Sequence, residues 1–543
     1  MQKLKQPWLL LALLAVCLSA PAAAQVPFVP PTAQLPAEID GVLRKVQQLE
    51  SQERWGEALT IYEEALRDHP QDATLGDRHN LAKIHYDLGR RYGDSSFLSA
   101  LANVSDRQAL GLYTEVLVKI ETHYVTAPNW EMIVSRGTQD LQIALYEKQF
   151  QGRHLAGRSR QELDAFAADV GRLTEGRQVR TRQQAVDAVV AATAFAEGRL
   201  GLPPTAVAME YTCAAIGALD AYSAYLTDAQ LNDVYSQIEG NFVGLGIELK
   251  AATGALQIVK VITGSPAERA GIRSGDRITE VDGKATADLS TDAAADLLQG
   301  PEGSLVRLVV LNAKNQARRL AVRREHVEVP SVDDVKIIDR DYGIGYLKLS
   351  CFQKTTSRDL DAALWKLHRE GMRSLIIDLR GNPGGLLTSS VEVADKFVDE
   401  GVIVSTRGRS PLEDFNYSAH KAGTWRVPLV VLIDGDSASA SEILAGAIRD
   451  HRRGNIVGER SYGKGSVQGI FPLSIAGAGV RLTTAKFYSP SGQPISHMGV
   501  QPNIVVRQAA KMSGDDDDAA ADLLGDSVLE AGVQAARGNT AKR

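Results

Sequence analysis

The feature that most constrains the fold is an alternation of short apolar runs with helical stretches between residues 342 and 490. The apolar runs lie at 345–349, 374–379, 429–434 and 455–458, and the helical stretches lie at 356–370, 387–398 and 441–451. Because consecutive parallel strands need a long crossover, usually a helix, this order predicts βαβ units around a mostly parallel sheet. A chain of 543 residues has room for several domains, so we expect a multi-domain α/β protein with this sheet domain at residues 328–510.

The N-terminal half has a helical texture. Residues 37–105 include a stretch at 54–66 that resembles half of a tetratricopeptide unit, although a plain helical hairpin is the favoured interpretation. Further helical patterns lie at 76–92, 106–125 and 130–147. Residues 150–200, rich in Arg, Gln, Ala and Glu, indicate a largely solvated helical insertion within the helical region 106–241.

Both ends of the chain carry their own signals. Lys3 and Lys5 precede an apolar core at 8–20 and a small-residue cleavage site, so residues 1–24 predict an export signal, with a retained anchor as the alternative. We therefore expect an exported protein, periplasmic or otherwise extracytoplasmic, without a membrane span in its mature chain. At the other end, residues 511–543 contain the acidic run 515–518 and a short helical pattern, which predict a solvated, partly disordered tail.

Composition excludes several classes of function. The net charge is only −6, from 60 basic and 66 acidic residues, so no broad basic surface is expected for nucleic acid. The mature chain would keep only Cys213 and Cys351, too few for a disulfide framework. No His/Cys cluster has metal-ligand spacing and no phosphate-loop pattern occurs, so we expect neither a metal nor an organic cofactor.

Glycines inside a strand-like run at 241–249 open a second module. They are followed in order by Gly-Ser-Pro-Ala at 264–267, Ala-Gly-Ile-Arg-Ser-Gly-Asp at 270–276 and a helical pattern at 290–298. This ordered set resembles a PDZ domain, a small β-barrel module, spanning residues 242–327. Glycines let successive backbone N–H groups face one anion, so the loop formed by Gly244, Leu245, Gly246 and Ile247 is expected to bind a C-terminal carboxylate. A similar small barrel without a ligand is the alternative.

Three alternating serines, Ser437, Ser439 and Ser441, lie between the apolar run 429–434 and the next helix. In isolation, Ser439 and Glu442 are typical of a capping box. However, amides at a helix N-terminus can also stabilise the oxyanion that develops during acyl transfer. A second strand-to-helix turn, Asp-Leu-Arg-Gly-Asn-Pro-Gly-Gly at 378–385, adds glycines that let backbone amides approach a carbonyl.

A candidate base follows the next strand. Lys464 lies between two glycines, and a lysine can act as a general base if burial lowers its pKa. Gln468 is four residues further on, and we expect it on a strand with Lys464 on the same face, where it could orient the amine.

Ser439, Lys464 and Gln468, with their spacings, resemble the carboxy-terminal processing (tail-specific) serine peptidases, over most of residues 109–510. The resemblance implies a crotonase/Clp-protease-like peptidase domain in which Ser439 is the nucleophile, Lys464 the general base and Gln468 its orienting partner. It also implies an oxyanion hole formed by the amides of Gly385 and Ala440. Ser437 and Ser441 would then be structural residues.

The expected function is a serine endopeptidase that selects protein or peptide substrates by their C-terminal tails, with the N-terminal helices as a possible adaptor site. Two alternatives stay open: a catalytically inactive PDZ-containing scaffold or chaperone, and a thioester-directed hydrolase or isomerase on a related framework. Ala221 and Asn503 depart from the family pattern, which usually has proline and often has aspartate at these positions. These departures leave the proposed chemistry untouched but put regulation and partners in doubt.

Overall fold

The structure is a computed structural model that describes residues 37–174, 176, 178–252, 255–286, 297–298, 300–507 and 525–540. The predicted export signal at 1–24, the acidic run 515–518 and most of the predicted helix 290–298 lie outside these residues. The chain divides into two compact units, Met1–Tyr86 and Asp87–Arg543.

In the first unit, helices α1 (Ala37–Ser51), α2 (Trp55–Asp68) and the start of α3 (Ala73–Gly93) enclose a small apolar core. Its fully buried members include Val46, Tyr62 and Leu75. The expected helical character of this region is confirmed, and α2 covers the tetratricopeptide-like stretch.

The second unit begins with a helical part that contains α4 (Ser95–Asn103), α5 (Asp106–His123), α6 (Trp130–Ala144), α7 (Lys148–His154), α8 (Arg160–Thr174), α9 (Arg182–Leu200) and α10 (Pro204–Gly217). Almost every residue of α10 is buried, because α5, α6 and α9 surround it. The prediction that residues 150–200 are helical is confirmed, and about half of the described residues in this stretch are exposed, although one face of each helix is buried. Phe166 of α8 and Ala188 of α9 are buried in this helical part, since each helix presents one apolar face to its neighbours.

Helix α11 (Asp228–Glu239) leads into the PDZ-like module. Its strands are β2 (Asn241–Gly244), β3 (Ile247–Ala252), β4 (Ala255–Val261), β5 (Arg277–Val281), β6 (Lys284–Ala285), β7 (Leu305–Leu311), β8 (Ala317–Arg323) and β9 (Glu325–Glu328), with helix α12 (Pro266–Arg269) between β4 and β5. The main sheet has the order β3-β4-β5-β7-β8, and β2 pairs with β9. Strand β3 is therefore an edge strand of this sheet, with Leu256, Ile258 and Ile278 in the core behind it.

The predicted βαβ domain is confirmed. Its sheet has the order β10-β11-β12-β15-β16-β19, parallel except for the antiparallel β10–β11 pair. The strands are β10 (Val332–Asp339), β11 (Ile344–Leu349), β12 (Ser374–Asp378), β15 (Leu429–Ile433), β16 (Gly454–Gly458) and β19 (Ile504–Val505). The connecting helices are α14 (Thr356–Arg369), α15 (Leu387–Asp395) and α16 (Ala440–Asp450).

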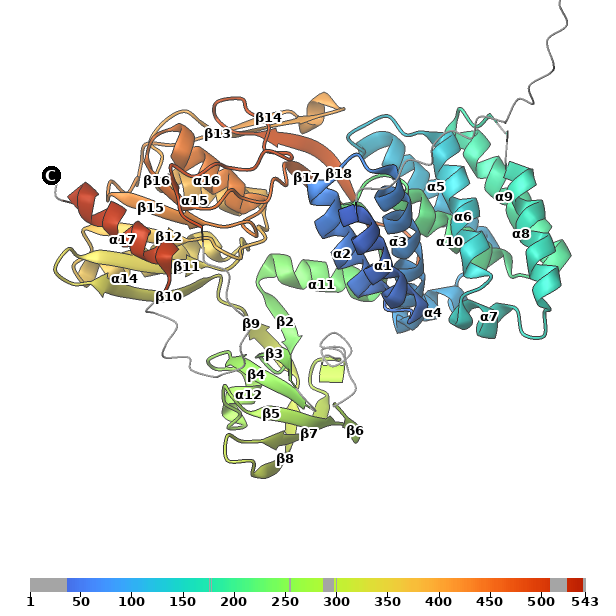
Figure 1. The fold of residues 1–543 in the computed structure, drawn as a ribbon, viewed down its shortest axis with the longest axis horizontal. Helices are drawn as coiled ribbons and strands as arrows, with labels where there is room; N and C mark the ends of the chain where they lie inside the picture. The colour runs from blue at the N-terminus through green and yellow to red at the C-terminus, as the bar shows by residue number, and fades with distance from the viewer. Residues whose placement is uncertain are drawn as a thin grey trace, which may run out of the picture. The chain divides into compact units, whose positions relative to one another are not determined.

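Both faces of this sheet are covered (Figure 1). Successive strand residues face opposite sides, so Leu375 and Ile377 join the core that includes α14, α15 and α16, whereas Ile376 faces the other side. There it packs in a second core with Val528 and Ala536 of α17 (Ser527–Thr540). The prediction of a solvated tail is therefore wrong for α17, because the second sheet face needs an apolar cover.

An antiparallel sheet completes the unit. It contains β1 (Ala224–Leu226), β13 (Val402–Gly408), β14 (Phe415–Ser418), β17 (Ser466–Pro472) and β18 (Gly479–Tyr488). The strand order is β1-β18-β13-β14, and β17 also pairs with β18. The short 3₁₀ helix η1 (Pro411–Glu413) lies between β13 and β14 in the sequence. Strand β1 precedes the PDZ-like module and β18 follows it by more than 100 residues in sequence. The pairing Ala224–Arg481 thus joins the helical part to the peptidase part.

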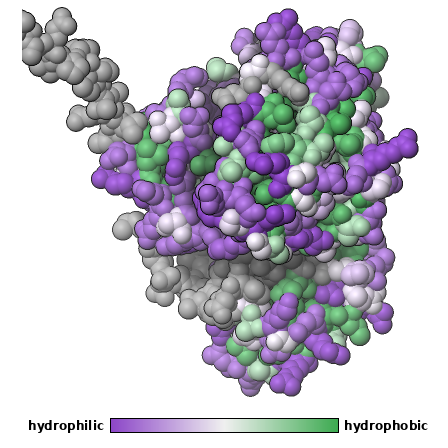
Figure 2. Space-filling model, turned by 90° about the vertical axis from the view of Figure 1, so that its right-hand side faces the viewer, coloured by the Kyte–Doolittle hydropathy of each residue, from purple (hydrophilic) through white to green (hydrophobic). Residues whose placement is uncertain are grey.

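The described surface is mainly polar. Figure 2 shows apolar residues scattered among hydrophilic ones on one face. Among the described helices, none combines the length and the apolar character needed to cross a lipid bilayer.

Candidate active site

Ser439 lies where the loop after β15 meets the first residue of α16. Its backbone has φ 56° and ψ −112°, a combination that a residue with a side chain rarely adopts. Such a conformation costs about 1–3 kcal/mol and persists only when the surroundings enforce it. The neighbouring N–H of Ala438 donates to the carbonyl oxygen of Asn382 at 3.0 Å, which ties this turn to the glycine-rich loop at 380–385.

The other two serines of the segment have structural partners. The Ser437 hydroxyl donates to the Leu379 carbonyl oxygen at 2.9 Å, and the Ser441 hydroxyl donates to the Asn382 carbonyl oxygen at 3.0 Å. Both residues are fully buried. Ser439, in contrast, lines a cavity, so it is the serine of the three that a substrate could reach.

The glycine-rich loop lies directly against Ser439. Gly384 has φ +107°, and a Cβ atom there would lie 2.8 Å from the Ser439 Cβ and 2.9 Å from the Ala440 nitrogen. The Phe352 N–H donates to the Gly384 carbonyl oxygen at 2.9 Å. Because C=O and N–H point in opposite directions across a trans peptide unit, the Gly385 N–H points away from Phe352.

The amides of Gly385 and Ala440 are both available. Within the described part of the chain, neither N–H donates a hydrogen bond to another group. Ala440 is the first residue of α16, where helical N–H groups lack intrahelical acceptors. Two such amides next to one serine fit the pair of donors that an oxyanion requires.

Glu442 connects the serine turn to the lysine loop. Its carboxylate accepts from the Ser439 N–H at 2.7 Å and from the Lys464 N–H at 2.9 Å. It also accepts from the Gly463 N–H at 2.7 Å and the Ser461 hydroxyl at 2.6 Å. The side chain is fully buried, and burial raises its pKa, while these hydrogen bonds act in the opposite direction. One carboxylate therefore fixes the backbone of both candidate catalytic segments.

Lys464 is half-buried beside this carboxylate, and its Nζ lies 4.9 Å from the centre of the Tyr222 ring. Burial lowers the pKa of Lys464, and nearby Arg481 lowers it further, whereas Glu442 and Asp220 oppose the shift. A lowered pKa enlarges the neutral fraction of the amine, and the neutral amine is the form that can accept a proton.

Gln468 differs from its expected placement. Strand β17 begins at Ser466, so Lys464 precedes the strand, and the β17–β18 register shifts between Val467 and Gln468. The Gln468 Nε2 donates to the Ser466 Oγ at 2.9 Å rather than facing the lysine amine along a regular strand. The expectation that Lys464 and Gln468 lie on one strand is thus wrong, because β17 begins only at Ser466.

Ser439, Gln468 and Gly385 line one cavity of about 430 Å³. Its wall is largely apolar and includes Val234 and Ile238 of α11, Cys351, Phe352, Leu386, Ile443, Ile470, Phe487 and the charged Arg481. An apolar cavity beside the serine suits an apolar substrate side chain. Burial raises the pKa of the Cys351 thiol to about 11, so this thiol stays protonated at neutral pH.

The PDZ-like loop turns the amides of Gly246 and Ile247 to one side. The Leu245 carbonyl oxygen accepts from the Ala267 N–H, and the Gly246 carbonyl oxygen accepts from the Ile262 N–H, each at 2.9 Å. The amides of Gly246 and Ile247, in the same peptide units, therefore point to the opposite side. The loop adjoins the edge strand β3, an arrangement that suits an added peptide strand.

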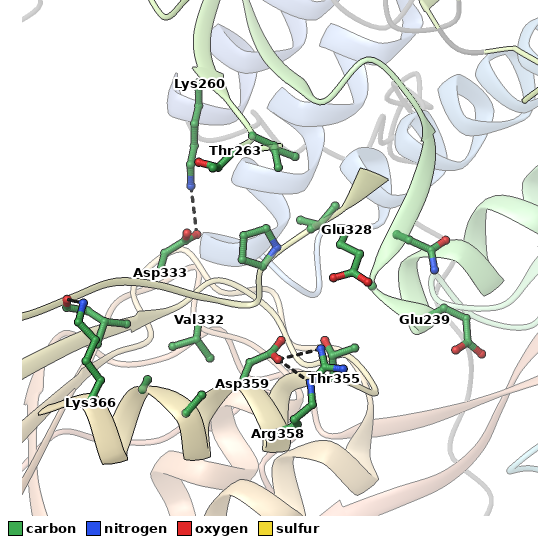
Figure 3. A pocket seen from close by; sticks show the side chains of 18 of the residues that line it. Glu239, Lys260, Thr263, Glu328, Val332, Asp333, Thr355, Arg358, Asp359 and Lys366 are labelled. Atoms are coloured by element: carbon green, nitrogen blue, oxygen red, sulfur yellow. Dashed lines mark hydrogen bonds and ion pairs between the residues drawn. The ribbon is translucent and has the colours of Figure 1, made fainter. Parts of the chain in front are cut away.

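A second cavity, of about 590 Å³, lies between the PDZ-like module and α14 (Figure 3). Charged side chains from both parts line it, and Lys260 pairs with Asp333 at 3.2 Å across it. None of the candidate catalytic residues lines this cavity.

Comparison with known proteins identifies the family. Residues 343–506 match peptidase family S41, and residues 257–312 match the PDZ domain. The carboxy-terminal-processing protease of Bartonella bacilliformis is 40% identical to the chain over 297 residues, which cover 53% of the chain and 67% of the relative. The chain belongs to the carboxyl-terminal-processing proteases of family S41. This family assignment makes the protein a serine peptidase with a PDZ domain.

Two further proteins are similar to this processing protease. The carboxyl-terminal-processing protease of Picosynechococcus is 34% identical over 292 residues, covering 53% of the chain and 70% of the relative. Among solved structures, the photosystem II D1 C-terminal processing protease is 26% identical, with coverage of 74% of the chain and 93% of that protein and a TM-score of 0.39.

Sequence reasoning missed part of the site of this processing protease. It assigned Glu442 only a capping role, although a carboxylate inside an apolar helix must find several donors. Arg481 and Tyr222 gave no local signal, because they reach the site through the β1–β18 pairing. Asn382 stood inside the glycine-rich motif, and its amide nitrogen donates to the Leu349 carbonyl oxygen at 2.8 Å, which holds the loop on β11.

Proposed function

We propose that this processing protease is an exported endopeptidase that cleaves proteins selected by their C-terminal tails. The observation that carries the proposal is the strained backbone of Ser439. This residue lies beside the N–H groups of Gly385 and Ala440, which donate no hydrogen bond within the described chain, and its own N–H binds the same Glu442 carboxylate as the Lys464 N–H. This arrangement supports Ser439 as nucleophile, Lys464 as general base and the amides of Gly385 and Ala440 as oxyanion hole.

The reaction has two stages. The neutral Lys464 amine takes the Ser439 proton as Oγ bonds to the peptide carbonyl carbon, and the carbonyl electron pair moves to the oxygen held by the two amides. Collapse breaks the C–N bond, and Lys464 returns its proton to the leaving amine. A water molecule, deprotonated in turn by Lys464, then attacks the ester carbon. The bond between this carbon and Oγ breaks, Lys464 returns the proton to Oγ, and the new carboxyl terminus and Ser439 are released.

Gln468 has a supporting role in this proposal. Gln468 lines the cavity with Ser439, and its Nε2 donates to the Ser466 Oγ. We propose that a change in its rotamer during the reaction brings the amide oxygen to the Lys464 amine. Such a hydrogen bond would orient the amine toward the serine hydroxyl.

The PDZ loop selects the substrate in this proposal. The amides of Gly246 and Ile247 would bind the terminal carboxylate, and the tail would extend along β3. Export through the signal at 1–24 would place the enzyme outside the cytoplasm, and the helices of residues 37–105 are a candidate adaptor surface.

The test compares residues 25–543 with the Ser439→Ala variant on an unfolded protein that ends in an apolar tail. Mass spectrometry detects fragments, and the same substrate with a C-terminal amide serves as the control. We expect the parent to cleave, Ser439→Ala to be inactive, and the amidated substrate to be cleaved more slowly. Binding without cleavage by the parent would favour an inactive scaffold instead.

A further inference from the structure

Arg380 begins the glycine-rich loop that carries Gly384 and Gly385. Its guanidinium is only 15% exposed and contacts two carboxylates. The Nη2 donates to Asp378 Oδ2 at 2.7 Å, and the Nε donates to Asp378 Oδ1 at 3.0 Å. On the other side, Nη1 and Nη2 donate to the two oxygens of Asp526 at 2.7 and 2.8 Å.

Asp378 is itself fixed within the sheet. It ends strand β12, is 1% exposed, and accepts from the Tyr346 hydroxyl at 2.8 Å. This partner therefore belongs to the sheet from which the loop departs. Asp526, in contrast, lies 146 residues after Arg380 in the sequence and belongs neither to the loop nor to its sheet.

Asp526 belongs to the start of α17. Its Oδ1 accepts from the Leu529 N–H at 2.9 Å, so the carboxylate caps the helix while it binds Arg380. Burial opposes its charge, but the Arg380 hydrogen bonds and the helix amides lower the pKa of Asp526. The carboxylate is therefore ionised at neutral pH and forms a charge-assisted, bidentate pair.

The first part of the loop is consequently held at two adjacent residues. The Gly381 N–H donates to the Asp434 carboxylate at 3.0 Å, which ties it to the turn that leads to Ser439. Arg380 is held through Asp526 by a helix that packs on the opposite face of the sheet from α16. These attachments add to the hydrogen bonds of Asn382 and Phe352, which hold the part of the loop nearer to Gly384 and Gly385.

We propose that Asp526 is a positioning residue of the active site, acting through Arg380 on the loop that presents the Gly385 amide. The inference rests on the proposed oxyanion role of that amide. Loss of Asp526 leaves the guanidinium with one carboxylate partner and lets the loop relax. Because oxyanion stabilisation depends on donor geometry, a small displacement slows the chemical step without weakening ground-state binding.

The experiment compares Asp526→Asn with Arg537→Gln in the full-length protein. Arg537 lies near the other end of α17 and pairs with Asp339 at 2.7 Å, so its variant also removes one ion pair between α17 and the sheet domain. We expect Asp526→Asn to lower kcat on a fluorogenic peptide by about 10- to 100-fold with KM changed less than about threefold. Arg537→Gln should stay within about twofold of the parent.

A second readout isolates the oxyanion. A peptide aldehyde forms a hemiacetal with the serine and needs the same amides, so its inhibition constant should rise in Asp526→Asn by the factor lost in kcat/KM. Affinity of the intact peptide for the Ser439→Ala background should not change. In an Arg380→Gln background, Asp526→Asn should have no further effect on kcat.

Two results would overturn the inference. The first is equal activity of Asp526→Asn and Arg537→Gln, and the second is an activity loss that appears only in KM or only together with a matching fall in Tm. Turnover that survives Ser439→Ala would instead contradict the proposed nucleophile, which separates the two failures.

Discussion

The loops of the proposed catalytic residues and the PDZ module of this processing protease are held by different kinds of contact, one buried and one exposed. In the loops of the proposed catalytic residues, the fully buried Glu442 fixes the backbones of Ser439 and Lys464 through hydrogen bonds of 2.7–2.9 Å. Between the PDZ module and the peptidase sheet, the ion pair Lys260–Asp333 has side chains 51% and 26% exposed.

These contacts differ greatly in strength. A buried, charge-assisted hydrogen bond is strong because water does not compete for it, whereas an exposed ion pair contributes about 0–1 kcal/mol. The comparison teaches that the loops of the proposed catalytic site are fixed by buried hydrogen bonds, while the Lys260–Asp333 pair adds little to the stability of the PDZ module's attachment.

Removing the proposed base should have the largest effect. We expect Lys464→Met to lower kcat by about 10³-fold or more, because the variant lacks the amine proposed to take the serine proton, while tail affinity stays the same. Steady-state kinetics and isothermal titration with a tail peptide measure the two quantities. Comparable losses in both would mean that Lys464 also binds the tail.

The pH dependence sharpens this prediction. Because burial lowers the pKa of Lys464, the neutral amine forms at a lower pH than in an exposed lysine. The parent's kcat/KM should therefore rise with pH and level off below the usual lysine pKa of about 10.4. A profile that still rises beyond that value would contradict a buried base.

Breaking the Glu442 network should have the next largest effect. In Glu442→Gln, an NH₂ group replaces one oxygen and faces either the N–H groups of Ser439 and Lys464 or the Gly463 N–H and the Ser461 hydroxyl. At least one N–H donor then loses its acceptor, so we expect a stability loss of about 2–3 kcal/mol and an activity loss of about 10²-fold. Urea unfolding and kinetics measure both. Parent-like activity in this variant would show that the two loops hold their places without the carboxylate.

A smaller effect should follow from closing the PDZ loop. Gly246 has φ +79°, and a Cβ there would lie 2.3 Å from the Ser265 Cβ, so Gly246→Ala should displace the carboxylate-binding amides. We expect about tenfold weaker tail binding and unchanged kcat on a short peptide. Gly275→Ala is the matched control, because Gly275 has φ +87° with open space around it. If both variants weaken tail binding equally, the loop is not the carboxylate site.

The exposed ion pair should matter least. We expect Lys260→Ala to change the free energy of unfolding by less than about 1 kcal/mol, with a difference that shrinks in high salt. Activity on tail-bearing substrates should stay within about twofold of the parent. An effect on activity above tenfold would show that this pair fixes the module for catalysis.

Much of the fold was predictable because its signals are local. Apolar runs and helical stretches placed β12, α15 and α16 nearly at their observed bounds, since each element is set by the period of its own residues. The antiparallel sheet was not predictable in this way. Its pairing of Ala224 with Arg481 joins residues that no short segment contains together.

The candidate site was likewise predictable only where its signals are local in sequence. Ser439 and the glycine-rich loop were found because each follows a recognisable strand. The strand placement of Lys464 was wrong because β17 begins only at Ser466, two residues after the lysine. The docking of α17 was missed because its buried residues include small ones such as Ala536, and an acidic run precedes it in the sequence.

The backbone of Ser439 has a consequence for how such an enzyme can be improved. Its φ of 56° is favourable only for glycine, so Ser439→Gly would relieve about 1–3 kcal/mol of strain while removing the reactive hydroxyl. Selection for thermal stability alone would therefore favour loss of the proposed nucleophile. Keeping serine at position 439 for the proposed activity therefore lowers the folding stability, so the stability–activity trade-off is located in one residue.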